Sequence, residues 1–298
     1  MHANYIIAND KGGVGKSTIA QYCILHLMRT VGEVRPVEYD RQPKLQRFFG
    51  DGIITQSIGP EWERQFNDPA SLATFWDPMV KWFQVKRPLV ADFGAQVWSY
   101  FHAWADSVML PEIIDSSRVT VLIPVTADAE AVVGALRVVR SAPAVLPKAR
   151  LVLLLCDKDG EVTLLQGMPE FRELREAVDA GRVEMRIIPV LSREGYPLLA
   201  SKGLRFDQIS KAKPVEIVHA TGATLTVASR TIKAVRTWMD AMEVALSDVL
   251  VAYQQAPNKV GQTGSQSKQP PANPAQFRPL RMTPSGAALK PACDANGA

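Results

Sequence analysis

Short apolar runs alternate with stretches of helical periodicity along most of the chain. The apolar runs have the length of buried strands and occupy residues 4–9, 35–39, 88–92, 118–125, 151–156 and 183–190. Apolar residues recur at helical spacing in residues 16–30, 71–84, 128–141, 170–180 and 223–253. Alternation of buried strands with amphipathic helices predicts an α/β fold, in which a mostly parallel sheet has helices on both faces.

The end of the chain has a different composition. Residues 255–298 are rich in Pro, Gln, Ser, Asn, Ala and Gly, and they carry five basic residues against one acidic residue. We therefore predict one domain over residues 1–254 and a disordered basic tail over residues 255–298. The tail accounts for the whole net charge of +4, so the pI of 8.9 does not itself indicate a basic nucleic-acid-binding domain. The tail is either a solvated extension or a weak electrostatic tether to DNA, RNA or an acidic partner.

The composition narrows the class of protein. Hydrophobic residues make up 47% of the chain and charged residues 21%, which is typical of a folded globular protein. No apolar run approaches the roughly 20 residues that a membrane span needs, and we find no secretory signal. Cys23, Cys156 and Cys293 form no C-x-x-C pair, which favours reduced thiols in a cytoplasmic protein.

The first apolar run leads into a glycine-rich segment, residues 9–18, with the sequence NDKGGVGKST. A strand, a glycine-rich turn and a helix in this order form an anion site, because backbone N–H groups and the helix N-terminus point at the phosphates. Lys16 is expected to reach the β- and γ-phosphates, the Ser17 hydroxyl to coordinate Mg²⁺, and the Thr18 N–H to assist phosphate binding. The standard pattern G-x-x-x-x-G-K-[ST] has glycine where this chain has Asp10. We expect the Asp10 carboxylate to point away from the nucleotide or to pair with a cation.

The segment KGGVGKST resembles the deviant Walker A motif, K-G-G-x-x-G-K-[ST], of the ParA/MinD family of ATPases. The similarity covers about residues 3–210. It implies that the nucleotide is bound by Lys11, Gly12, Gly13, Val14, Gly15, Lys16, Ser17 and Thr18. Lys11 matches the family's signature lysine, which reaches across a dimer interface to the nucleotide of the other subunit. A second cation beside the γ-phosphate can stabilise charge that develops in phosphoryl transfer.

Two further segments resemble the switches of this family. VEYDRQPKL is similar to the D-x-D-x-Q of switch I, and Asp40 would then orient or activate the attacking water. The alternative for Asp40 is a loop aspartate that caps a helix. LVADFGA places Asp92 at a strand end, where a Walker B carboxylate holds Mg²⁺ through water. The D-x-G-A form is similar to the TraL and StbB types, ParA-like proteins of conjugative and stability modules on plasmids.

The residues expected near the nucleotide base differ from the family's sequence pattern. Pro124 matches the proline that follows a strand on the nucleotide side. Cys156-Asp157-Lys158-Asp159 stands where the family often has an adenine-contacting asparagine, and it is not a correctly spaced guanine reader. ATP is therefore expected from the resemblance alone.

The resemblance implies a slow, partner-stimulated ATP hydrolase that forms a homodimer around Mg-ATP and positions, segregates or transfers plasmid DNA. It implies non-specific DNA binding by basic residues towards the C-terminus, for which the candidates are Arg230, Lys233 and Arg236. These residues recur at helical spacing, and a solvated helix face is the alternative. The expected adaptor is a ParB-like, relaxosome or stability-module protein.

Other functions stay open at this stage. One is a MinD-like positioning switch without DNA binding, although prolines in the tail argue against a terminal membrane helix. Another is a module that binds a partner and merely retains nucleotide. An aromatic-rich segment, residues 62–104, is expected to supply core residues in its first part. Trp98, Tyr100 and Phe101 are candidates for either the core or a partner surface.

Overall fold

The computed structural model describes residues 3–59, 69–192 and 196–250. The predicted boundary between domain and tail at residue 254, and the tail itself, lie outside these residues and stay predictions. Trp62 and Phe66 also lie outside them.

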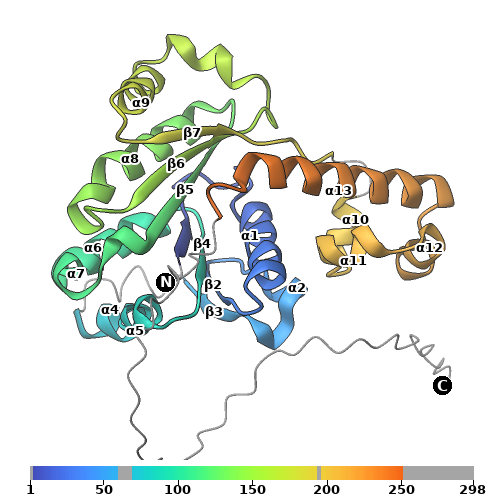
Figure 1. Cartoon of the computed structure of the whole chain (residues 1–298), viewed down its shortest axis with the longest axis horizontal. Coiled ribbons are helices and arrows are strands. Elements are labelled where there is room, and N and C mark those ends of the chain that lie inside the picture. The colour runs from blue at the N-terminus through green and yellow to red at the C-terminus, as the bar shows by residue number, and fades with distance from the viewer. Residues whose placement is uncertain (1–2, 60–68, 193–195, 251–298) are drawn as a thin grey trace, which may run out of the picture. The chain divides into compact units, whose positions relative to one another are not determined.

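Seven parallel strands form the centre of the fold (Figure 1). They lie in the order β3-β2-β4-β1-β5-β6-β7, and every neighbouring pair is parallel. Their bounds are β1 Asn4–Ile7, β2 Arg35–Asp40, β3 Ile54–Ser57, β4 Leu89–Phe93, β5 Val119–Val125, β6 Arg150–Leu155 and β7 Glu184–Ile187. The central strands are buried along their length because both faces of the sheet are covered.

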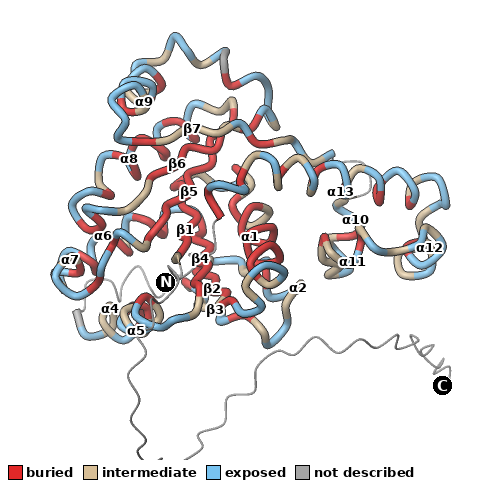
Figure 2. Tube along the Cα trace, viewed as in Figure 1, coloured by how far each residue is buried: buried red, intermediate tan, exposed pale blue. Residues whose placement is uncertain are grey.

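Helices cover both faces of the sheet. One core packs beneath α4 Pro69–Trp76, α5 Pro78–Gln84, α6 Val97–Ser107, α8 Ala129–Val145 and α9 Pro169–Asp179. The opposite core packs beneath α1 Lys16–Thr30, α10 Tyr196–Ser201, α11 Phe206–Lys211, α12 Pro214–Thr221 and α13 Leu225–Leu246. Short helices α2 Gln46–Phe49 and α7 Leu110–Ile113 complete the connections. Figure 2 shows the buried residues concentrated along the strands and on the inner faces of these helices. The predicted fold class, a P-loop α/β fold with a mostly parallel sheet, is confirmed.

The structure differs from the prediction in several elements. The sequence did not predict helices α2, α6, α7, α10, α11 and α12. The helix expected over residues 71–84 is two helices, because Pro78 has no N–H to continue the hydrogen-bond ladder. The terminal helix expected over residues 223–253 is Leu225–Leu246. Strand β3 was missed, because its residues ITQS form an exposed edge strand without an apolar signal.

An aromatic cluster fills the space beneath β2 and β4. Tyr39 stacks on Trp76 with ring centroids 4.4 Å apart, and it meets Phe93 edge to face at 5.6 Å. Trp98 and Phe101, for which a partner surface stayed open, are fully buried parts of this core. The cluster therefore supports the two strands that carry Asp40 and Asp92.

No helix among the described residues combines the length and the apolar character that crossing a bilayer requires.

Candidate functional site

The glycine-rich segment forms a phosphate-loop geometry between β1 and α1. Gly13 and Gly15 have φ angles of 81° and 94°, which an L-residue with a Cβ adopts only with strain. Helix α1 begins at Lys16, directly after Gly15. The first N–H groups of this helix have no intrahelical partner, so the loop and the helix start together form a site for an anion.

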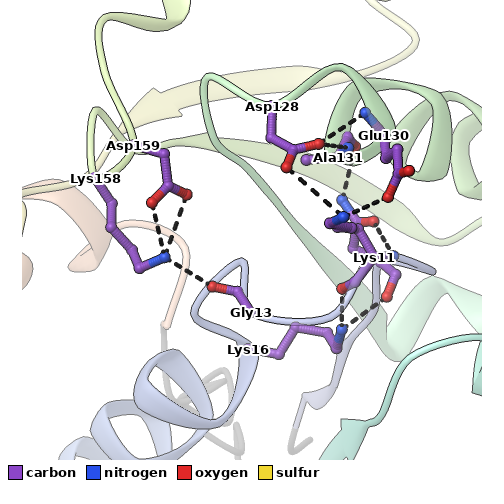
Figure 3. A network of polar contacts seen from close by, with 9 residues as sticks. Lys11, Gly13, Lys16, Asp128, Glu130, Ala131, Lys158 and Asp159 are labelled. Carbon is purple, nitrogen blue, oxygen red and sulfur yellow. Dashed lines mark hydrogen bonds and ion pairs between the residues drawn. The ribbon is translucent and has the colours of Figure 1, made fainter.

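Lys16 lies at the base of this loop. Its ammonium donates to the backbone oxygens of Asn9 at 2.8 Å and Lys11 at 2.7 Å (Figure 3). Burial lowers the pKa of Lys16, while the nearby carboxylates Asp92 and Asp40 raise it. The ammonium is thus held inside the loop by carbonyl groups.

Asp92 is the next-to-last residue of β4, and its carboxylate is completely buried. Neither oxygen forms a hydrogen bond of ordinary geometry with a described residue. Burial raises the pKa of Asp92 to about 7. The nearby Ser17 hydroxyl lowers this pKa, although its geometry is not that of an ordinary hydrogen bond. A buried carboxylate with unsatisfied oxygens next to a serine hydroxyl is an oxygen donor set that fits Mg²⁺.

Asp40 ends the neighbouring strand β2 and adjoins Gly94, just beyond Asp92. Its Oδ1 accepts from the Gln42 N–H at 3.0 Å, which fixes the first turn after the strand. The Gly94 N–H donates to Tyr39 O at 2.7 Å, and a Cβ at residue 94 would lie 2.7 Å from Asp40 Cγ. The two predicted switch segments are therefore in direct contact.

Glu38 holds the segment that follows Asp40. Its buried carboxylate accepts hydrogen bonds from the N–H groups of Lys44 at 2.5 Å and of Leu45 at 3.0 Å, and it reaches the Gln46 N–H at 3.3 Å. Burial raises the pKa of Glu38, and these N–H groups partly offset the effect. Glu38 is thus an anchor for the loop from Asp40 to α2.

Lys11 turns towards the N-terminus of α8 in the same chain. Its ammonium pairs with Glu130 and lies 3.7 Å from Asp128 Oδ2 (Figure 3). Asp128 caps α8 by accepting from the Glu130 N–H at 2.8 Å. The resemblance places Lys11 at a partner's nucleotide; the monomer holds it on its own α8 instead.

Asn9 and Asp10 connect the phosphate loop to the body of α8. Asn9 Nδ2 donates to Pro124 O at 2.7 Å and Ala131 O at 2.9 Å, while its Oδ1 accepts from the Lys11 N–H. Asp10 Oδ2 pairs with Arg137 Nη1 at 2.7 Å. The expectation that Asp10 pairs with a cation is confirmed.

A cavity of about 690 Å³ extends from the phosphate loop towards α13. Its far part is lined mainly by apolar and aromatic side chains, including Ile188, Val190, Tyr196 and Trp238. Lys158 also lines this cavity, and its ammonium donates to Gly13 O at 3.0 Å (Figure 3). A polar loop beside an apolar cavity has the chemistry that a nucleoside triphosphate requires.

The candidate DNA-binding residues lie on α13, away from the phosphate loop. Arg230, Lys233 and Arg236 are all exposed. Arg236 Nε donates to Ser210 O at 2.5 Å, so this guanidinium also ties α13 to α11. The spacing on one helix is as predicted, and their binding to DNA stays a prediction.

Sequence reasoning gave no role to several residues that shape the site. Arg137, Glu130 and Lys158 contact residues 10, 11 and 13 from far along the chain, and no local pattern marks such contacts. Asn9 could have been found, since it belongs to the quoted motif.

The fold and the loop geometry define an α/β protein of the P-loop class. Comparison of the chain with protein-family models and with curated proteins found no match. Among solved structures it is similar to apo McdA from Cyanothece, with 14% identity and a TM-score of 0.46 over 76% of this chain and 99% of McdA. It is also similar to the MinD cell division protein of Aquifex aeolicus, with 13% identity and a TM-score of 0.41 over 78% of this chain and 97% of MinD.

A third similar structure is cobyrinic acid a,c-diamide synthase from Mycobacterium smegmatis, which contains bound ADP and magnesium. It is 16% identical with a TM-score of 0.37, over 65% of this chain and 87% of that one.

Proposed function

We propose that this protein is an ATPase switch of the ParA/MinD type, which binds Mg-ATP at the loop of residues 11–18. The observation that carries the proposal is the convergence of Lys16, Ser17 and the buried, unsatisfied Asp92 carboxylate at the start of α1. Phosphate would be bound by the loop N–H groups and by Lys16. Ser17 directly, and Asp92 through water, would hold Mg²⁺.

Bound Mg²⁺ would neutralise charge on the β- and γ-phosphate oxygens. Asp40 would orient the attacking water, since it ends β2, the strand that pairs with the one that carries Asp92. Its contact with Gly94 would let both switch segments respond together to the γ-phosphate.

The Mg-ATP state is proposed to be a homodimer in which Lys11 of each subunit reaches the other subunit's nucleotide. Formation of this dimer requires Lys11 to leave Glu130 and Asp128. Glu130 is 75% exposed at this pair, and such surface pairs contribute little net stability. The intramolecular pair is therefore a resting position that nucleotide and a second subunit can displace.

The cargo is proposed to be plasmid DNA, bound non-specifically by Arg230, Lys233 and Arg236 and handled with an adaptor protein. Support comes from the exposure of these side chains on one helix. The bond from Arg236 to Ser210 favours a second candidate, a positioning switch or partner-binding module without DNA binding. DNA binding that occurs only in the ATP state and weakens as the salt concentration rises would support the first candidate.

The test measures molar mass by light scattering, with and without Mg-ATP, for wild type and three variants. We expect Asp40→Ala, which slows hydrolysis, to accumulate as a dimer with Mg-ATP. Lys11→Ala should bind nucleotide but stay monomeric, and Lys16→Ala should fail to bind. An unchanged mass of Asp40→Ala in saturating Mg-ATP would contradict the switch.

A further inference from the structure

Strand β7 is the edge of the sheet on the side opposite β3. The Ile188 N–H, just after the strand, donates to Leu155 O of β6 at 2.9 Å. Backbone groups alternate in direction along a strand, so Glu184 and Arg186 also face β6. The N–H groups of Met185 and Ile187, and the Ile187 carbonyl, therefore face outward. This edge can pair with one more extended chain.

A groove of about 410 Å³ runs beside this edge, beneath α9 and the 3₁₀ turn Val162–Gly167. Its apolar lining consists of Leu155, Val162, Phe171, Met185 and Ile187. Ile187 is 72% exposed, and Leu164 on the neighbouring turn is 76% exposed. An exposed large apolar side chain such as Ile187 at the edge of an apolar groove is typical of an interaction site. Alternate side chains of an added strand would enter this groove.

Two cations flank the groove on α9. Arg172 and Arg175 are exposed, and neither forms an ion pair with a described residue; the Arg175 guanidinium donates to the Met185 sulfur, at 3.9 Å. The neighbouring Arg140 and Arg150, in contrast, pair with Glu173 and Glu184. One carboxylate, Asp157, also lines the groove and accepts from the Val162 N–H at 2.9 Å. Among the residues that line the groove, two guanidinium groups and one carboxylate leave an excess of one positive charge that a ligand can neutralise.

We propose that the β7 edge and this groove bind an extended peptide segment of a partner protein that carries acidic residues beside alternating apolar ones. The backbone of the peptide would pair with Met185 and Ile187, and its carboxylates would pair with Arg172 and Arg175. The chain's own residues 255–298 do not fit, because they carry five basic residues against one acidic residue.

The groove and the nucleotide cavity share the loop after β6. Leu155 and Asp157 line the groove, whereas Cys156 and Lys158 line the cavity. Lys158 in turn donates to Gly13 O of the phosphate loop. A bound peptide would therefore contact the loop that also contacts the phosphate site.

The test uses a displayed library of short random peptides, selected on the full chain. The most enriched peptide is then synthesised with a fluorescein label, and its affinity is measured by fluorescence anisotropy. We expect acidic residues beside alternating apolar ones, and a loss of affinity of about tenfold or more in the Arg172→Glu, Arg175→Glu variant. Lys148→Glu, Lys202→Glu is the control; it makes the same charge change at two exposed lysines and should bind like wild type.

Two readouts identify the mode of binding. A peptide with its acids replaced by lysine should lose affinity for wild type and regain it with the Arg172→Glu, Arg175→Glu variant. Amide hydrogen exchange should slow at Met185 and Ile187 when the original peptide binds. The proposal is overturned if no peptide is enriched, if the charge-reversed variant binds equally well, or if these two amides stay unprotected. No part of this test depends on ATP turnover.

Discussion

At the residue scale, the fold changes the ionisation of Asp92 at the candidate site. Burial raises the pKa of its carboxyl to about 7, and Glu38 and Asp40 add to the effect, while Ser17 and Lys16 oppose it. A carboxyl with this pKa in the folded chain, and an ordinary pKa in the unfolded chain, favours folding only while it stays protonated. The site thus carries a cost in stability that a bound cation would relieve.

Because of this cost, we predict that Asp92→Asn changes the free energy of unfolding in a pH-dependent way, in protein freed of metal and nucleotide. As pH rises from about 4 to about 7, the unfolded chain releases the Asp92 proton while the folded chain retains it, so wild type loses stability relative to the variant. Above pH 7 the difference should level off, at a few kcal/mol in order of magnitude.

Urea unfolding of both proteins in EDTA between pH 4.5 and 8 measures the difference. Asp106→Asn, at an exposed position on α6, is the control and should show no such trend. A stability difference between wild type and Asp92→Asn that is constant over this range would contradict the assignment of the cost to Asp92.

At the scale of elements, β2 and β4 bring the two predicted switches together. Gly94 has no side chain, and this allows the segment after Asp92 to pass directly against Asp40. Since a Cβ there would also lie 3.0 Å from the Asp40 Cα, the contact involves backbone that cannot move aside easily.

Gly94→Ala should therefore displace Asp40 while leaving the phosphate loop intact. We expect kcat for ATP to fall by about tenfold or more, with a much smaller change in the affinity for Mg-ATP, because the lost interaction acts on the attacking water. Gly167→Ala is the matched control, since a Cβ there meets no atom within 4 Å. Equal losses in kcat and in affinity would show that Gly94 instead supports nucleotide binding.

The elements that the sequence predicts well are those with a strong local signal. The helix over residues 16–30 begins and ends as expected, because Gly15 precedes it and Gly32, with φ of 86°, follows it. The break at Pro78 was missed because helical periodicity continues across it. The edge strand β3 was missed because its residues have no apolar pattern.

At the scale of the whole molecule, the parallel sheet gathers the carboxyl ends of its strands at one edge. The phosphate loop, Asp40 and Asp92 come together there although they are distant in sequence. The sequence predicted these residues because each directly follows an apolar strand. It did not predict the contacts of Arg137 with Asp10 or of Lys158 with Gly13, which depend on how α8 and the β6 loop pack.

The central claim is that the loop of residues 11–18 binds Mg-ATP through Lys16. Calorimetric titration of Mg-ATP into wild type, Lys16→Ala and the control Lys148→Ala tests it most directly. We predict one site per chain in wild type and in the control, and a loss of affinity of about a hundredfold or more in Lys16→Ala, and thermal unfolding of the free proteins checks that each variant is folded. Equal binding by wild type and Lys16→Ala, or no binding by wild type, would contradict the claim.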